Sequence, residues 1–157
     1  MEGGTKHLTK SQTTIYTDGS KTKQGVGSGF VVYYKNQLIH SDHTTLPFHT
    51  TVFQAEIHAI LKAGQYIKSS RANREYKFVK ILSDSQAAVK ALHNDRITSK
   101  VVHAAHEVWE TLADDCPVVL AWIKAHVGHE GNELADRARF FKEMPKLATW
   151  SLLASSE

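Results

Sequence analysis

Cysteine is nearly absent from this 157-residue chain, and long apolar runs are absent altogether. The single cysteine, Cys116, has no partner for a disulfide within the chain, so the fold requires no oxidising compartment. No apolar run approaches the roughly 20 residues of a membrane-spanning helix, and the polar start, residues 1–11, lacks the apolar centre of a secretory signal. We therefore expect an intracellular protein that makes no membrane contact.

A strong charge imbalance is also lacking. Lys and Arg exceed Asp and Glu by 19 to 16, a net charge of +3 that permits an anionic partner but would not hold a polyanion tightly through charge alone. Internal repeats and low-complexity segments are missing as well. At 157 residues the chain has room for one domain with a real hydrophobic core, and we expect this domain to be a monomer.

The two ends of the chain lack the periodic apolar pattern of the middle. We expect flanks at 1–12 and 144–157 and one domain over 13–143. Runs rich in β-branched and aromatic residues predict strands, and apolar residues three or four apart predict helices. The predicted strands are 13–17, 26–34, 37–45, 77–82 and 118–123, and the predicted helices begin at Thr50 or Thr51, near Ser85, near Ser99 and near Leu134. This order predicts an α/β fold with a mixed sheet and helices on both faces.

Four acidic residues occupy positions where a folded chain would least accept an isolated charge. Asp18 and Asp84 follow strand-like runs, Glu56 lies on the apolar stripe of its helix, and Asp136 belongs to the last predicted helix. A bare buried charge is costly, and acids that share one dry corner repel unless protons or cations lie between them. Because hard oxygen ligands suit magnesium or manganese, the sequence predicts a metal-dependent enzyme.

Three of these acids have an ordinary explanation when each is taken alone. Asp18 precedes a glycine, as a turn former would, and Asp84 lies where a helix cap would lie. Asp136 is one turn into a predicted helix, where the helix dipole favours a negative charge. Glu56 is harder to explain in this way. We favour a shared metal site over four coincidences.

Two other patterns suggest chemistry that we do not favour. His103 and His106 lie three apart on a predicted helix, but the second histidine of a zinc-protease motif and a cysteine cluster are missing, so surface positions are the simpler interpretation. Gly25, Gly27 and Gly29 alternate along a strand and do not open a helix, so they form no dinucleotide-binding motif. They let a nucleic-acid backbone come close, or they mark a bulge.

Four fragments in a fixed order carry a family resemblance. They are Tyr-Thr-Asp18-Gly-Ser, Gln-Ala-Glu56-Ile-His-Ala, Ser-Asp84-Ser, and the segment from Trp122 through His126 and Asn132 to Asp136. Over 13–141 the chain resembles type 1 ribonuclease H domains. The sequences of its motifs are most similar to those of the ribonuclease H domains in non-LTR (LINE-type) retrotransposon polyproteins. The resemblance implies a ribonuclease H-like fold whose five-stranded mixed sheet has the order 3-2-1-4-5. It also implies a role in reverse transcription, with a reverse transcriptase domain of the same polyprotein as a candidate partner.

Members of that family cut the RNA strand of an RNA/DNA hybrid and leave 5′-phosphate and 3′-hydroxyl ends. They use two divalent ions, Mg²⁺ or Mn²⁺ as its substitute: one activates water, and the other stabilises the leaving oxygen and the charge on the phosphate. The resemblance assigns Asp18 to both ions, Glu56 and Asp84 to the leaving-group side, and Asp136 to the nucleophile side.

The resemblance also assigns residues around the acids. His126, ten residues before Asp136, matches a loop histidine that moves protons or assists product release, work that suits an unperturbed pKa of about 6.5. His129 is the nearby rival, which the spacing to Asp136 disfavours. The candidate substrate contacts are Gly19, Ser20, Thr51, Gln54, Ser85 and Asn132.

The chain departs from cellular members of the family at two places. The positions where those members often carry Asn or Gln that contact ribose 2′-hydroxyl groups are Val52, Phe53 and Gln54 here. Where many members carry a basic protrusion that grips DNA, this chain has only Arg96 and Lys100 as fixed cations.

Two competing functions follow from these departures and from the wider fold class. The first is a catalytically weak nucleic-acid or partner-binding module on the same fold, which the presence of all four acids disfavours. The second is a transposase-like or resolvase-like DNA nuclease, which the loop from His126 to Asp136 and the compact length disfavour. Hybrid-specific cleavage is the function that we expect.

Overall fold

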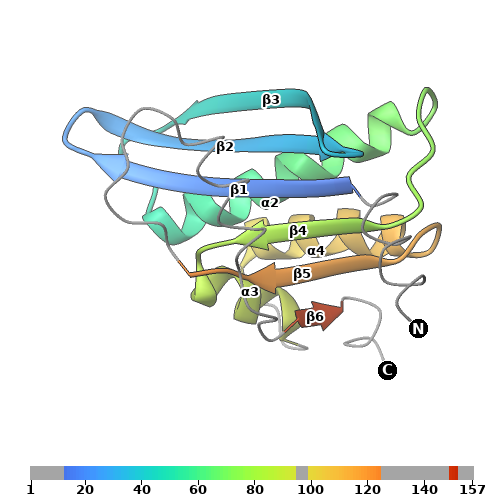
Figure 1. The fold of residues 1–157 in the computed structure, drawn as a ribbon. Helices are drawn as coiled ribbons and strands as arrows, with labels where there is room; N and C mark the ends of the chain where they lie inside the picture. The colour runs from blue at the N-terminus through green and yellow to red at the C-terminus, as the bar shows by residue number, and fades with distance from the viewer. Residues whose placement is uncertain (1–12, 95–98, 125–148, 152–157) are drawn as a thin grey trace.

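The computed structural model describes residues 13–94, 99–124 and 149–151, which form one mixed sheet with helices (Figure 1). Its strands lie in the order β3-β2-β1-β4-β5-β6, which confirms the predicted order 3-2-1-4-5 and adds β6 beside β5. The strands are β1 (Thr13–Thr22), β2 (Gly25–Tyr34), β3 (Gln37–Leu46), β4 (Val79–Ser83), β5 (Val118–Trp122) and β6 (Thr149–Ser151). The helices are α2 (Val52–Ser70), α3 (Gln86–His93) and α4 (Lys100–Ala113). The sequence does not predict β6, which falls in the segment expected to be a flank.

The sheet contains both antiparallel and parallel pairs, and β6 pairs antiparallel with β5. β1, β2 and β3 form an antiparallel meander, whereas β1 pairs with β4 and β4 with β5 in parallel. Lys35 and Asn36 join β2 to β3 and have φ of 51° and 68°, which is the conformation of a two-residue hairpin turn. The irregularity in the β2–β3 pairing lies between Val32 and Tyr33, so the alternating glycines of β2 do not mark a bulge.

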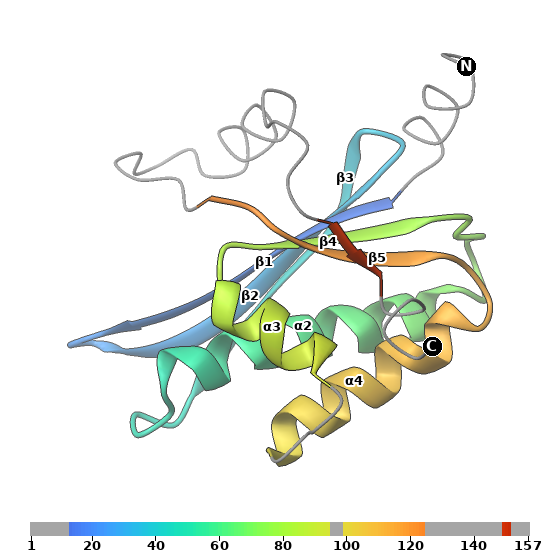
Figure 2. The ribbon, with the colours of Figure 1, turned by 90° about the horizontal axis from the view of Figure 1, so that it is seen from below.

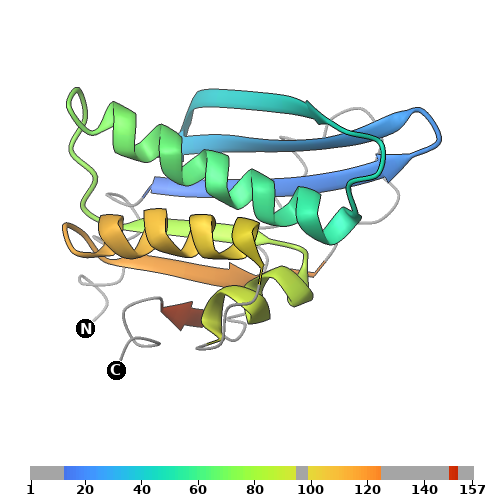
Figure 3. The same ribbon diagram turned by 180° about the vertical axis from the view of Figure 1, so that it is seen from behind.

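The three described helices lie on one face of the sheet (Figure 2). Figure 3 shows α2 across β1 and β2, and α4 across β4 and β5. The order of elements in the sequence predicts helices on both faces, and the predicted helix near Leu134 lies outside the described residues. No helix within the described residues has both the length and the apolar character that a membrane crossing needs.

The core follows from the two-residue period of the strands. Ile15 and Ile81 point toward the helices, whereas the next residues, Tyr16 and Leu82, belong to a smaller cluster on the opposite face. On the helical side the largest fully buried side chains are Trp109, Ile15, Ile57, Ile60, Ile67, Ile81, Leu92, Leu120, Val32, Val79 and Val89. The helices therefore stabilise the sheet mainly through one apolar layer.

Strand β1 is longer than the sequence predicts. A strand ending at Thr17 is expected because Asp18, Gly19 and Ser20 are polar or flexible, yet β1 runs to Thr22. Backbone pairing with β2 explains the difference, since Asp18 lies opposite Gly29 and the ladder continues to the end of the hairpin. Only the pairing with β4 stops at Thr17. Asp18 therefore lies inside a strand, one residue beyond the last β1–β4 pair.

Helix α4 packs tightly against α2 at Gly64. A Cβ atom on Gly64 would lie 2.7 Å from Cγ1 of Val108 and 2.8 Å from Nε1 of Trp109. Trp109 is buried, and its indole N–H donates a hydrogen bond to the Ile60 carbonyl at 2.8 Å, so the ring has no room to move aside. The contact requires glycine.

We expect Gly64→Val to destabilise the protein by about 2 kcal/mol. Overpacking costs about 1–3 kcal/mol, whereas replacing glycine by valine improves helix propensity by only about 0.3 kcal/mol. Urea unfolding followed by circular dichroism measures the change. Gln65→Ala, at an exposed position of the same helix, is the control and should change stability by less than about 0.5 kcal/mol. Equal stability of Gly64→Val and the parent would contradict this packing.

Candidate metal centre

Parallel pairing brings two of the predicted acids together. Thr17 and Ser83 are the last partners of β1 and β4, so Asp18 and Asp84 are the next residues in the same register. Neighbouring strands lie about 4.8 Å apart, and equal register therefore places the two residues side by side at one edge of the parallel sheet. Ligand sites in open α/β sheets commonly lie at such carboxyl ends.

Helix α2 supplies the third acid. Its N-cap is Thr51, one of the two predicted candidates: Thr51 Oγ1 accepts the Gln54 N–H at 3.0 Å, and Gln54 Oε1 accepts the Thr51 N–H at 2.9 Å. This capping box determines where the helix begins and therefore which face it turns to the sheet. Glu56 lies on the buried face, as the apolar spacing predicts, and is 4% exposed.

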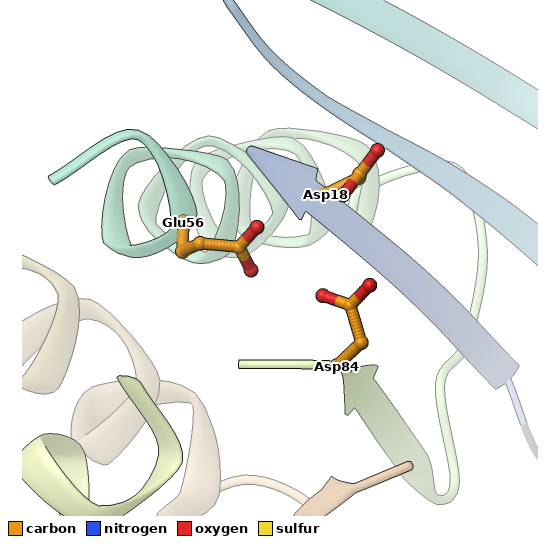
Figure 4. Close-up of side chains that lie close together, drawn as sticks. All are labelled: Asp18, Glu56 and Asp84. Carbon is orange, nitrogen blue, oxygen red and sulfur yellow. The ribbon is translucent and has the colours of Figure 1, made fainter. Parts of the chain in front are cut away.

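The three acids form one cluster. Asp18, Glu56 and Asp84 each offer a carboxylate oxygen, and these oxygens lie within 4.8 Å of one another. Figure 4 shows the side chains of Glu56 and Asp84 extending from α2 and from the end of β4 toward β1, which carries Asp18. Among the described residues, this is the only group of three or more His, Cys, Asp or Glu ligands at such distances.

Gly19 connects the cluster to the backbone of β1. Its N–H donates to Glu56 Oε1 at 2.7 Å, while Ser83 Oγ lies 3.5 Å from Oε2, which is a long hydrogen bond. A Cβ atom on Gly19 would lie 2.5 Å from the backbone nitrogen of Glu56 and 2.7 Å from the carbonyl carbon of Ala55. Only glycine therefore lets β1 come this close to α2. The sequence predicts Gly19 only as a substrate contact, and neither this structural role nor the contact of Ser83 was predicted.

The electrostatics of the cluster favour a cation. Burial first, then the negative charge of Asp84 and, less strongly, that of Asp18 together raise the pKa of Glu56 from the ordinary 4.5 to about 8, while the hydrogen bonds from Gly19 and Ser83 oppose the rise. A positive charge between the acids would remove the repulsion. Three carboxylates are hard oxygen donors of the kind that magnesium and manganese prefer, so the described donor set fits the predicted divalent ions.

The other predicted site residues fall into two groups. In the described part of the chain, Ser85 caps α3 by accepting the Ala88 N–H at 3.1 Å, and Ser20 is exposed on β1. Outside it lie His126, Asn132 and Asp136, whose assignments stay predictions. The structure therefore brings together three of the four predicted metal ligands and leaves the fourth undescribed.

A contact between Ser28 on β2 and His58 on α2 was not predicted. Ser28 Oγ lies 2.7 Å from Nδ1 of His58. Ser28 adjoins Gly29, the partner of Asp18, and His58 follows Glu56 by two residues, so the contact ties the hairpin to the helix beside the acids. Burial, with a contribution from the charge of Lys62, lowers the pKa of His58 and favours its neutral form.

An open groove lies next to the cluster, and Asp18 is the one of the three acids that lines it. Its volume is about 620 Å³, and it lies partly over Gly27 and Gly29, which face Ser20 and Asp18 in the β1–β2 ladder. The absence of side chains on these glycines leaves the sheet bare there, and the ring of His43 approaches from β3. The groove provides room for an extended ligand next to the acids.

The two histidines of α4 do not form a metal site with other described residues. His103 is exposed, and His106 Nδ1 lies 3.3 Å from Oε2 of Glu110. Neither belongs to a group of three or more ligands in the part of the chain that the structure describes. Surface positions remain the simpler interpretation.

Fold and site together define a class: α/β domains with an acidic site, suited to a cation, at the carboxyl end of their parallel strands. The chain belongs to the RNase H family, whose model, described as RNase H, matches residues 10–139. The matched range contains all four predicted acids. The enzyme class expected from the sequence, ribonuclease H, agrees with this membership.

Three solved structures share the fold. RNase H1 from the halophilic archaeon Halobacterium salinarum is 20% identical, with a TM-score of 0.54, and the match covers 80% of this chain and 92% of that chain. The N-terminal RNase H domain of Rv2228c from Mycobacterium tuberculosis, solved as a fusion with maltose-binding protein, is 15% identical, with a TM-score of 0.60 and coverage of 82% and 93%. LC11-RNase H1 in complex with an RNA/DNA hybrid is 18% identical, with a TM-score of 0.61 and coverage of 82% and 99%. At these identities the likeness concerns the fold.

We expect magnesium binding to depend on pH through Glu56. In the metal-free folded protein this residue keeps its proton up to a pH of about 8, and a bound cation must displace that proton. Affinity should therefore rise as the pH approaches and passes this value. Calorimetric titrations in two buffers of different ionisation enthalpy measure the proton released. Glu56→Gln has no proton to lose, and equal release from both proteins would disprove the assignment.

The same shift predicts how the stability of the metal-free protein varies with pH. Between 4.5 and about 8 the folded state keeps the Glu56 proton and the unfolded state has lost it, so the unfolded state binds fewer protons. The contribution of Glu56 to stability is fully present below 4.5 and is lost as the pH rises to about 8. Comparing urea unfolding of the parent and Glu56→Gln across this range isolates the contribution.

Gly19→Ala should weaken magnesium binding by about 10–100-fold, the usual effect of disturbing the support of a metal ligand. The added methyl group meets the backbone of α2, which has no flexible end to move, so β1 and α2 must separate. Magnesium titration measures the loss. Gly29→Ala is the matched control, because its methyl group points to β3, 3.2 Å from the Asp42 carbonyl, and its affinity should stay close to that of the parent.

Proposed function

We propose that this protein is an endoribonuclease that hydrolyses the RNA strand of RNA/DNA hybrids and leaves 5′-phosphate and 3′-hydroxyl ends. The observation that carries the proposal is the cluster of Asp18, Glu56 and Asp84 in a chain of the RNase H family. One protein with the same fold was crystallised with an RNA/DNA hybrid, which supports this substrate class. The groove beside Asp18 offers space for an extended strand.

We infer that the acids hold two Mg²⁺ ions, with Mn²⁺ as a substitute. When bound, such ions lower the pKa of water and neutralise charge that develops on a phosphate. Asp18 lies on β1, which pairs with β4 and packs against α2, and would serve both ions, and Glu56 and Asp84 would serve the leaving-group side. Asp136, from the sequence alone, would serve the nucleophile side, and His126 would move protons or assist product release.

The capping box of α2 prepares two residues for the substrate. Gln54 is exposed, and because its Oε1 accepts from Thr51, its amide NH₂ is the end that can donate to a ribose hydroxyl or a phosphate. Thr51 Oγ1 accepts from the Gln54 N–H and keeps its own O–H as a donor. Ser20 adds an exposed hydroxyl beside Asp18. We propose that these groups help to recognise RNA where Val52 and Phe53 replace the amides of cellular relatives.

The biological setting is part of the proposal. The fragments around Asp18, Glu56 and His126 favour a ribonuclease H domain of a retrotransposon polyprotein, and this domain is expected over 13–143. It would act inside the cell, beside a reverse transcriptase domain of the same polyprotein. In that setting the neighbouring domains would supply the grip on the hybrid that the mild charge of +3 does not.

Cleavage of three labelled substrates tests the function. We expect an RNA/DNA hybrid to be cut in the presence of Mg²⁺ and spared with EDTA, and duplex RNA and duplex DNA to be spared in both. Asp84→Asn should reduce cleavage at least about 100-fold, because it keeps the shape of the side chain and removes a charged ligand. Circular dichroism should show an unchanged fold.

The other outcomes distinguish the competing functions. Hybrid binding without cleavage by the parent protein would indicate the inactive binding module. Cleavage of duplex DNA would indicate a nuclease of the transposase or resolvase kind. Cleavage by Asp84→Asn at the parental rate would remove the carboxylate cluster from the mechanism.

A further inference from the structure

The side chain of Phe48 is largely exposed to solvent, although burial of its apolar ring would be favourable. It lies between β3 and α2 and is 63% exposed, the largest value for a large apolar side chain in the described residues. Val52, the first residue of α2, is 47% exposed. Single exposed apolar residues are common, so exposure alone assigns no role.

Hydrogen bonds and a cation hold this ring in place. The Thr50 N–H donates to the Pro47 carbonyl at 2.9 Å and closes a turn around Phe48. Lys21 of β1 donates from Nζ to the Thr50 carbonyl at 3.2 Å, and the same Nζ lies 5.6 Å from the centroid of the Phe48 ring. The turn therefore presents an aromatic face and a positive charge together. We call Phe48 and Lys21 the Phe48–Lys21 platform.

The platform adjoins the metal centre through two elements. Lys21 lies three residues beyond Asp18 on β1, about 10 Å along an extended strand. Thr50 precedes Thr51, the N-cap of the helix that carries Glu56. A distance of about 10 Å corresponds to about three steps of a nucleic-acid duplex at 3.4 Å each. A hybrid that runs from the acids past the N-terminal end of α2 would reach the platform.

We propose that the Phe48–Lys21 platform binds the hybrid a few nucleotides from the cut site. The Phe48 ring packs against the sugar face of one strand, and Lys21 pairs with an adjacent phosphate. Proteins that bind nucleic-acid strands combine aromatic faces with cations in this way, because every nucleotide offers an apolar surface and a negative charge. Contact of this kind raises affinity without reading base sequence. The inference rests on the proposed function and adds a substrate-binding residue to it.

Kinetics of Phe48→Ala test the platform. We expect KM for a hybrid to rise about 5–10-fold with kcat unchanged, because the ring contacts substrate away from the reacting phosphate. Phe48→Tyr keeps an aromatic face and should retain the parental KM. Leu38→Ala is the matched control: Leu38 is 47% exposed, but it lies opposite Tyr33, the partner of Thr14, at the other end of the strands from Asp18.

Salt dependence tests the role of Lys21. Lys21→Gln should reduce the slope of log affinity against log salt concentration by about one, because one phosphate contact is lost. Fluorescence anisotropy with a labelled hybrid, in the Asp84→Asn background that prevents turnover, measures this slope. Phe48→Ala should weaken binding in the same assay and leave the slope unchanged.

The outcomes separate this inference from the proposed function. Parental KM and binding in Phe48→Ala overturn the platform, while hybrid cleavage by the parent leaves the function in place. If the parent does not cleave hybrids, the binding assay still tests the platform: a loss in Phe48→Ala but not in Leu38→Ala supports it, and equal affinity overturns it. A change in sedimentation of Phe48→Ala with unchanged hybrid affinity assigns the ring to a protein contact and also overturns it.

Discussion

The approach of β1 to α2 at Gly19 is the constraint on which the site depends. The strand comes close enough for the Gly19 N–H to reach Glu56 at 2.7 Å only because no side chain separates the two backbones. This contact aligns a helical carboxylate with two others that the parallel register of β1 and β4 already brings side by side. Without it, Glu56 would lie apart from the other two acids.

The cluster is costly to form, and the rest of the fold stabilises it. Burial and two neighbouring negative charges raise the pKa of Glu56, so the charged state of the metal-free site opposes folding. The apolar layer between the helices and the sheet, with Trp109 and Ile60 joined by a hydrogen bond, supplies the compensating stability. A bound cation would relieve the repulsion. This relation between charge and packing explains why ligand binding and folding should be coupled here.

Local patterns predicted much of this arrangement. The apolar spacing of α2 indicates that Glu56 faces inward, which is confirmed. The predicted strands 26–34 and 37–45 leave only Lys35 and Asn36 between them, and the structure has a hairpin turn there. The polar residues after Thr17 misled the prediction of β1, because pairing between backbones does not require apolar side chains. Three-residue β6 is too short to carry a period of its own, so the sequence offered nothing from which to predict it.

The sequence by itself determined the kinds of elements, the inward direction of Glu56 and the membership in a family, because periodicity and motif order are properties of neighbouring residues. Only the tertiary structure decided that Asp18 and Asp84 share a register, that Gly19 meets Glu56, and that Ser28 meets His58. These pairs are separated by 30 residues or more along the chain, and Gly19 and Glu56 by 37. Contacts at such separations depend on how strands pair and how closely a helix packs, which no local pattern records.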